Sequence, residues 1–141
     1  MADSLATLKA RIASELNRAD LTTQIASAVT SAIAFYRSYR FEFNELIFAF
    51  NTVAGQQTAT APANPGEIDS IRLTTGASIY VLEPINFAEM QELTNSTTET
   101  GRPTRWSWYT QTLYLHPVPD AIYSMAMSCV HRQAAPANDA D

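Results

Sequence analysis

The sequence contains little cysteine, little glycine and no excess of positive charge. Cys129 is the single cysteine among 141 residues, which excludes an intramolecular disulfide and a site built on two cysteines. Nine Lys and Arg stand against fourteen Asp and Glu, a net charge of -5, so tight DNA binding through a basic surface is not expected. No signal peptide and no run near the roughly 18 apolar residues that span a bilayer is present. We expect a soluble chain without a membrane partner that folds in a reducing cytoplasm.

A hydrophobic content of 46% in 141 residues predicts one domain with one core, residues 1–133. The pattern divides this domain into a helical part, 1–41, and a mainly β part, 42–133. Residues 134–141 are rich in Ala and Asp and lack an apolar face, which predicts a flexible tail. The predicted class is therefore α+β.

Two helices are predicted before residue 41. Leu5, Leu8, Ile12 and Leu16 recur at helical spacing behind Asp3 and Ser4, and either of those two residues can cap the first turn. A second helix is expected from Asp20, as its N-cap, to about Arg40. Its centre is built from Ala, Ser, Thr and β-branched residues, so tertiary packing has to hold it.

The remaining pattern predicts short, mostly antiparallel strands in a sheet or small sandwich, with one short helix inserted. The segment 44–53 reads as a strand, and 58–61 as its hairpin partner across the Gly55 turn. A second hairpin is expected from 68–73 and 78–82, followed by a short helix capped by Asn86 and then a polar loop at 94–100. In the last strand the alternate residues Tyr123, Met125, Met127, Cys129 and His131 should face the core.

The search for reactive groups yields only weak candidates. Cys129 and His131 share one strand face, and His116 is the only other imidazole, so core packing is favoured over a metal site. Carboxylate pairs that could cleave a glycosidic bond are Glu42 with Glu45 and Glu89 with Glu92, but surface positions at helix ends and loops explain them more simply. We therefore predict no catalytic residue, no cofactor and no metal.

The segment 101–123 combines alternating aromatic residues with Gly101-Arg102-Pro103 and Pro117-Val118-Pro119-Asp120. Trp106 and Trp108 lie two apart and should share a face, either in the core or at a protein interface; a platform for stacking sugars or bases is the less favoured alternative. Our predicted interface residues are four on this segment and four in the tail: Arg105, Trp106, Trp108, Tyr109, Ala134, Pro136, Asn138 and Asp139.

These motifs resemble those of one family, the head-to-tail adaptor (tail accessory) proteins of short-tailed bacteriophages. The resemblance extends over nearly the whole chain and is carried by the helix end at 34–41, the Phe43-Asn44-Glu45 join, Thr52 with Gly55-Gln56-Gln57, and the 68–73 strand. Its strongest part is Leu113-Tyr114-Leu115-His116-Pro117-Val118-Pro119-Asp120-Ala121-Ile122-Tyr123.

The resemblance implies a structural virion protein, made in the host cytoplasm and located at the junction of capsid and tail. It implies a ring of identical copies, twelve in number, that binds the portal protein, extends the DNA channel and carries the tail nozzle, with double-stranded DNA passing without sequence-specific binding. Two alternatives stay open: a virion-associated peptidoglycan hydrolase and a small ligand-binding β-domain.

Overall fold

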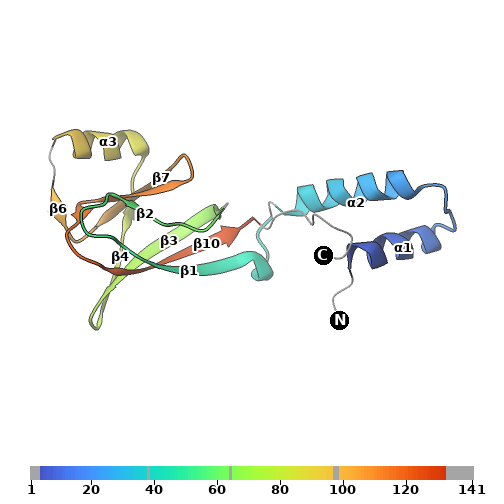
Figure 1. Cartoon of the computed structure of the whole chain (residues 1–141), viewed down its shortest axis with the longest axis horizontal. Coiled ribbons are helices and arrows are strands. Elements are labelled where there is room, and N and C mark those ends of the chain that lie inside the picture. The colour runs from blue at the N-terminus through green and yellow to red at the C-terminus, as the bar shows by residue number, and fades with distance from the viewer. Residues whose placement is uncertain (1–3, 38, 64, 97–98, 133–141) are drawn as a thin grey trace. The chain divides into compact units, whose positions relative to one another are not determined.

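The computed structural model describes residues 4–37, 39–63, 65–96 and 99–132 (Figure 1). These residues form two compact units: the first contains the helices up to Arg40, and the second is Phe41–His131. The mixed α+β class is confirmed, with two helices first, then mostly antiparallel strands and a short helix between strands. The predicted tail residues Ala134, Pro136, Asn138 and Asp139 lie outside the described residues.

The first unit is a pair of contacting helices, α1 (Leu5–Glu15) and α2 (Thr22–Tyr36). Ser4 caps α1, because its hydroxyl accepts a hydrogen bond from the Thr7 backbone N–H at 3.2 Å. The prediction that Asp20 caps α2 is wrong: Leu21 holds the N-cap position without a side-chain bond. The Asp20 carboxylate instead accepts two hydrogen bonds from the Arg18 guanidinium, at 2.7 and 2.6 Å, which lower the pKa of Asp20.

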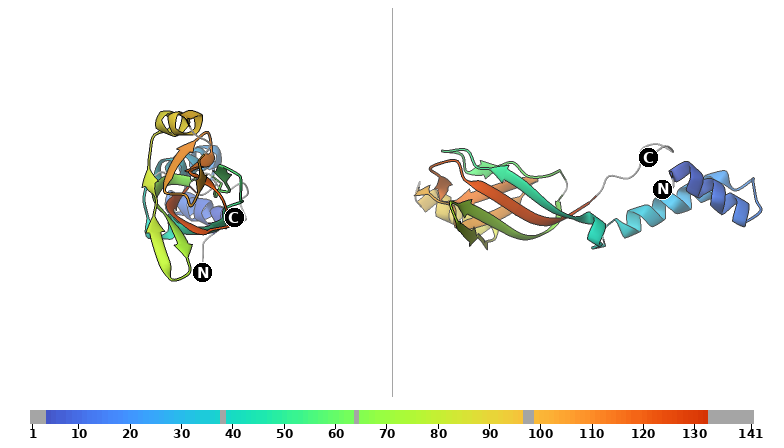
Figure 2. Two further views of the ribbon diagram at one scale, coloured as in Figure 1. Left: turned by 90° about the vertical axis from the view of Figure 1, so that its left-hand side faces the viewer. Right: turned by 90° about the horizontal axis from the view of Figure 1, so that it is seen from below.

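The second unit begins with a 3-10 turn and contains a four-stranded antiparallel sheet, here called sheet A. Its strand order is β1-β10-β3-β4, so β1 and β4 are the edge strands (Figure 2). The predicted 68–73 and 78–82 hairpin is present as β3 and β4, and Gly76 supplies the positive φ of +58° in its turn. The bounds are η1 Glu42–Asn44, β1 Glu45–Asn51, β3 Pro65–Thr75, β4 Ser78–Val81 and β10 Ser124–His131.

A second sheet, sheet B, packs its inner face on sheet A and has its outer face covered by α3 (Phe87–Ser96) (Figure 1). Asn86 caps α3 as predicted, accepting from the Glu89 N–H at 2.8 Å, and the helix extends through Ser96 into the segment expected to be loop. The strands of sheet B, in spatial order, are β2 Thr58–Ala59, β8 Thr112–His116, β7 Arg105–Tyr109 and β5 Glu83–Pro84. A short parallel pair, β6 Thr100–Gly101 and β9 Val118–Pro119, lies beside them.

The core fills the space between sheets A and B. Met125, Met127 and Cys129 of β10 face it as the alternation predicted, while Tyr123 and His131 are half-buried. Sheet B contributes the inward-facing Leu113 and Leu115 of β8, both fully buried. Burial also raises the pKa of the Cys129 thiol, because the interior disfavours the thiolate.

The prediction that 58–61 forms a hairpin with the first strand is wrong. Thr58 and Ala59 pair with Tyr114 and Leu113 of β8, in the other sheet. The cause is the turn after β1, where Gly55 has φ +77° and its N–H donates to the Pro119 carbonyl at 2.7 Å. This bond directs the chain across to sheet B before a hairpin can form.

Thr52 is a buried polar residue that joins β1 to the segment before β10. Its hydroxyl donates to the Ala121 carbonyl at 3.0 Å and accepts from the Tyr123 N–H at 2.8 Å, and its side chain is among the most deeply buried. We expect Thr52→Val, which keeps the shape and removes the hydroxyl, to lower the free energy of unfolding by about 1–3 kcal/mol, since both backbone partners lose a buried bond.

Urea unfolding measures this effect, and Thr52→Ser, which keeps the hydroxyl, is the matched control. Equal stability of the Val variant and the parent chain would show that the bridge contributes nothing.

Candidate interaction surface

The four predicted interface residues on β7 divide between the two faces of sheet B. Trp106 is 7% exposed and belongs to the core, and Trp108 packs against the same core, so the shared face is confirmed. Arg105 and Tyr109 lie on the opposite, outer face. Arg105 is half-buried, and its Nε lies 3.4 Å from Oε2 of Glu83 on the neighbouring strand β5. The role of these residues in an interface stays a prediction.

The outer face of sheet B carries an aromatic cluster with helix α3. Phe87, on the first turn of α3, stacks on Tyr109 with ring centroids 4.0 Å apart and planes 6° from parallel. Tyr114 of β8 approaches the same phenylalanine at 5.0 Å. Tyr109 nevertheless remains 52% exposed, so the cluster is fixed in place yet accessible. An aromatic surface of this kind suits contact with another protein.

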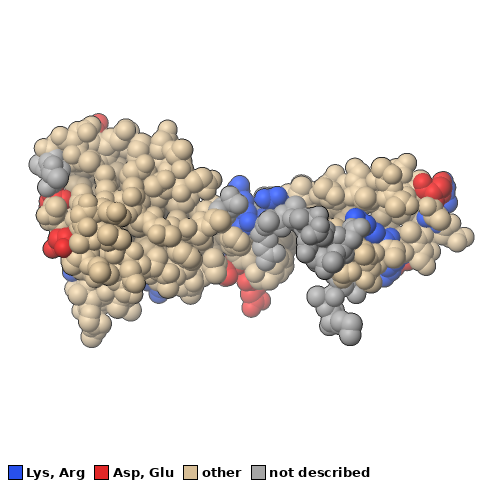
Figure 3. All heavy atoms as spheres, viewed as in Figure 1, with Lys and Arg blue, Asp and Glu red and all other residues tan. Residues whose placement is uncertain are grey.

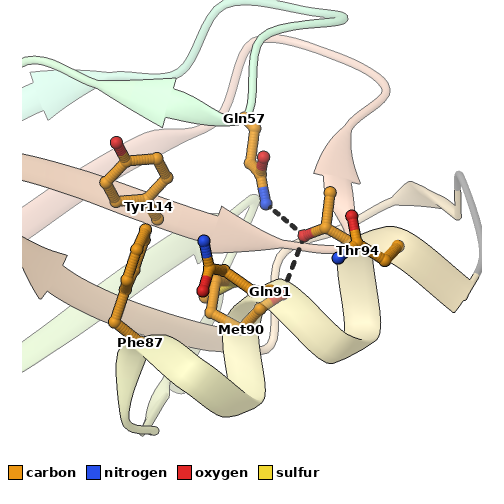
Figure 4. Close-up of a pocket in the computed structure, with 7 residues that line it drawn as sticks. Gln57, Phe87, Met90, Gln91, Thr94 and Tyr114 are labelled. Atoms are coloured by element: carbon orange, nitrogen blue, oxygen red, sulfur yellow. Dashed lines mark hydrogen bonds between the residues drawn. The ribbon is translucent and has the colours of Figure 1, made fainter.

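A hollow of about 210 Å³ opens beside the aromatic cluster (Figure 4). The Gln57 side-chain amide donates to the Thr94 hydroxyl at 2.6 Å, and that hydroxyl donates to the Met90 carbonyl at 2.8 Å. All its lining residues are uncharged: Gln57, Phe87, Met90, Gln91, Thr94, Asn95 and Tyr114. Neutral amides beside aromatic rings can bind peptide groups.

This part of the surface was only partly foreseen. The sequence pattern predicted a short helix capped by Asn86, but gave no sign that Phe87 on this helix stacks on Tyr109 rather than entering the core. The period-two alternation of β7 places Tyr109 on the opposite face of the strand from Trp106 and Trp108. This alternation was the signal in the sequence that could have located the outer face.

The carboxylates that were considered for glycoside cleavage lie on the surface of the protein. Glu42, Glu45, Glu89 and Glu92 are all exposed, so none occupies the apolar pocket that a glycosidase acid requires. Within the described residues no group of three or more His, Cys, Asp or Glu could hold a metal. The His116 imidazole, buried on β8, has Nε2 3.6 Å from Oε2 of Glu99.

A bond between Tyr123 and Asp120 shapes the turn that enters β10. The Tyr123 hydroxyl donates to Oδ1 of Asp120 at 2.7 Å, and this bond raises the pKa of Tyr123 above 10.0, with desolvation and the carboxylate charge acting in the same direction. A raised pKa in the folded state means that the stabilisation is present below about pH 10 and is lost as the pH rises through the folded pKa.

We expect Asp120→Ala to move the titration midpoint of Tyr123 down toward 10.0. NMR of ring-labelled tyrosine across the alkaline range measures the midpoint, and the five other tyrosines serve as internal controls. An unchanged midpoint would mean that the bond does not form in solution.

In a comparison with known families, the model of the SU10 adaptor protein family matches residues 3–141. The chain belongs to the SU10 adaptor protein family. The family resemblance predicted from the sequence is thereby confirmed, and membership supports an adaptor role in a bacteriophage virion. A comparison with curated proteins finds no match.

SU10 adaptor membership also bears on partners and location. An adaptor implies contact with portal and tail proteins and a place in the virion. None of the helices in the described ranges has the length and apolar character needed to span a membrane.

Proposed function

We propose that this protein is a head-to-tail connector that forms a ring of identical copies on the portal vertex. The ring, with twelve copies, extends the DNA channel and provides the platform to which the tail nozzle attaches. The observation that carries this proposal is the match to the SU10 adaptor family over residues 3–141. In Figure 3 the visible side of the β unit is mostly free of charged side chains.

Charge supports the passage of DNA through such a ring. Between residues 41 and 131 the chain has three arginines and nine carboxylates. A wall of this composition repels phosphates, so it can let a genome pass without retaining it. Acidic side chains located on the outside of an assembled ring would remove this part of the proposal.

The test is the assembly of virus particles without this protein. We expect DNA-filled heads that lack tails, and expect tails to be restored when the protein is added back to those heads. Particles that acquire tails normally without it would contradict the proposal.

A zymogram on peptidoglycan distinguishes the proposed connector from the hydrolase alternative. Glu42→Gln, Glu45→Gln, Glu89→Gln and Glu92→Gln are compared one at a time with the parent chain. A cleared band that one of these substitutions abolishes would establish an enzyme and overturn the structural assignment.

A further inference from the structure

Sheet A ends in two edge strands that lie on opposite sides of it, β1 and β4 (Figure 2). Within the described part of the chain, β1 pairs only with β10, and β4 pairs only with β3. An open strand edge presents backbone N–H and C=O groups that can pair with another chain.

The hydrogen bonds of β4 show which of its residues face the open edge. The Leu82 N–H donates to the Ile71 carbonyl at 2.9 Å, so Leu82 points its backbone groups toward β3. In an antiparallel ladder these directions alternate, and Ile79 and Val81 therefore point their N–H and C=O groups away from β3. The same reasoning applies to β1.

On β1 the reference bond is that of Thr52, whose N–H donates to the Tyr123 carbonyl at 3.0 Å. Every second residue before Thr52 has the same orientation, so the backbone groups of Phe50 and Phe48 point toward β10. The backbone groups of Ile47 and Ala49 therefore point outward. Each edge strand thus has at least two residues, spaced two apart, whose backbone N–H and C=O groups point outward.

The side chains at these edges are apolar and exposed. Val81 is 69% exposed, Ile79 63% and Ile47 66%, and all three lie on the outer face of sheet A. The four residues of β4 include no charge and no proline, the usual devices that prevent edge pairing. The β3–β4 hairpin also projects beyond the neighbouring strands (Figures 1 and 2).

We infer that β4 of one copy pairs with β1 of the next, so that sheet A continues from copy to copy around the ring. Strand directions permit this, because every neighbouring pair in β1-β10-β3-β4 is antiparallel, and a further β1 after β4 keeps the alternation. The contact is head-to-tail, the kind that closes into rings. This inference rests on the proposed ring.

We choose the register that keeps the backbone alternation and also pairs the most exposed apolar side chains of the two edges. It sets Val81 opposite Ile47 of the next copy and Ile79 opposite Ala49, as hydrogen-bonded pairs. The two most exposed apolar side chains of the edges then cover each other, and Tyr80 on the inner face comes opposite Phe48 of the next copy.

Cross-linking tests this register in the full chain bound to the portal protein. The double variant Ile47→Cys with Val81→Cys places one cysteine on each edge, and Cα atoms of a hydrogen-bonded antiparallel pair lie about 5.5 Å apart, within the range of a disulfide. Mild oxidation should yield covalent multimers up to the whole ring.

The matched control is Ile47→Cys with Ile122→Cys, since Ile122 is equally exposed but lies on neither edge. We expect about tenfold more multimer from the first pair than from the control, as only the first pair lies within disulfide range. Dimers from Val81→Cys alone would indicate a symmetric β4–β4 contact and overturn the inference. A ring that forms on the portal without this cross-link would also overturn it, while leaving the proposed function intact; absence of any ring with the unmodified chain would remove both.

A proline substitution in the edge strand β4 provides an independent test. Val81→Pro removes an outward N–H and no bond to β3, so the chain should fold as before while ring formation on the portal is lost. Tyr80→Pro is the contrasting control because it removes an inward N–H and should destabilise the fold itself. Normal rings from a folded Val81→Pro chain would contradict the inference.

Discussion

Replacing Trp106 with alanine is expected to lower the free energy of unfolding by about 3–5 kcal/mol. The indole is 7% exposed and lies in the core cluster with Leu115 directly opposite on β8. Truncation removes its apolar contacts and leaves a cavity that the two sheets cannot fully close. A loss of this size is a large fraction of the stability of a domain.

Tyr109→Ala is the matched control, on the same strand but on the outer face. It should cost only about 0.5–1.5 kcal/mol, since it removes mainly the stacking on Phe87. Urea unfolding of both variants measures the difference. Full stability of Trp106→Ala would contradict the core position; full stability combined with loss of assembly would favour the interface role predicted from the sequence.

Separating the chain at the boundary between its two units should give one fragment that folds alone and one that does not. We expect residues 41–132 to fold alone and unfold cooperatively, because every member of the core cluster lies within Phe41–His131. Residues 1–40 should lose most of their helix, since α1 has no buried residue and α2 has only Ile25 and Val29.

Far-ultraviolet circular dichroism and amide NMR of the two fragments distinguish these outcomes. Dispersed amide signals and a single sharp melting transition are expected for 41–132, and a near-coil spectrum for 1–40. Unfolding of the 41–132 fragment would show that the helical pair is needed for its core and would favour the single domain predicted from the sequence.

The sequence was most informative where a local pattern decides the structure. The alternation of Met125, Met127 and Cys129 identified the core face of β10, and Asn86 identified the start of α3, because side-chain period and capping act within a few residues. The β3–β4 hairpin was equally accessible through its Gly76 turn.

The features that were missed depend on contacts between distant segments. The partner of Thr58 and Ala59 is set by a bond from Gly55 to Pro119, 64 residues later, and no local propensity encodes it. Asp20 satisfied the rule for an N-cap, but Arg18 competes for the same carboxylate through two charge-assisted bonds. The stacking of Phe87 on Tyr109 likewise requires the helix to lie across sheet B.

The pair of strand edges that we propose for assembly was the hardest feature to predict. An exposed strand edge has the same sequence as a paired one, so Ile47, Ile79 and Val81 read as ordinary strand residues. Only the strand order of sheet A shows that they lie at edges.

Native mass spectrometry of the purified chain, with and without the portal protein, tests the central claim most directly. The account predicts that a defined number of 15.5 kDa copies, twelve in the proposed ring, adds to the portal in one closed assembly. A portal that gains no copies, or gains a variable number without a closed ring, would contradict the claim that this protein works through contacts among identical copies.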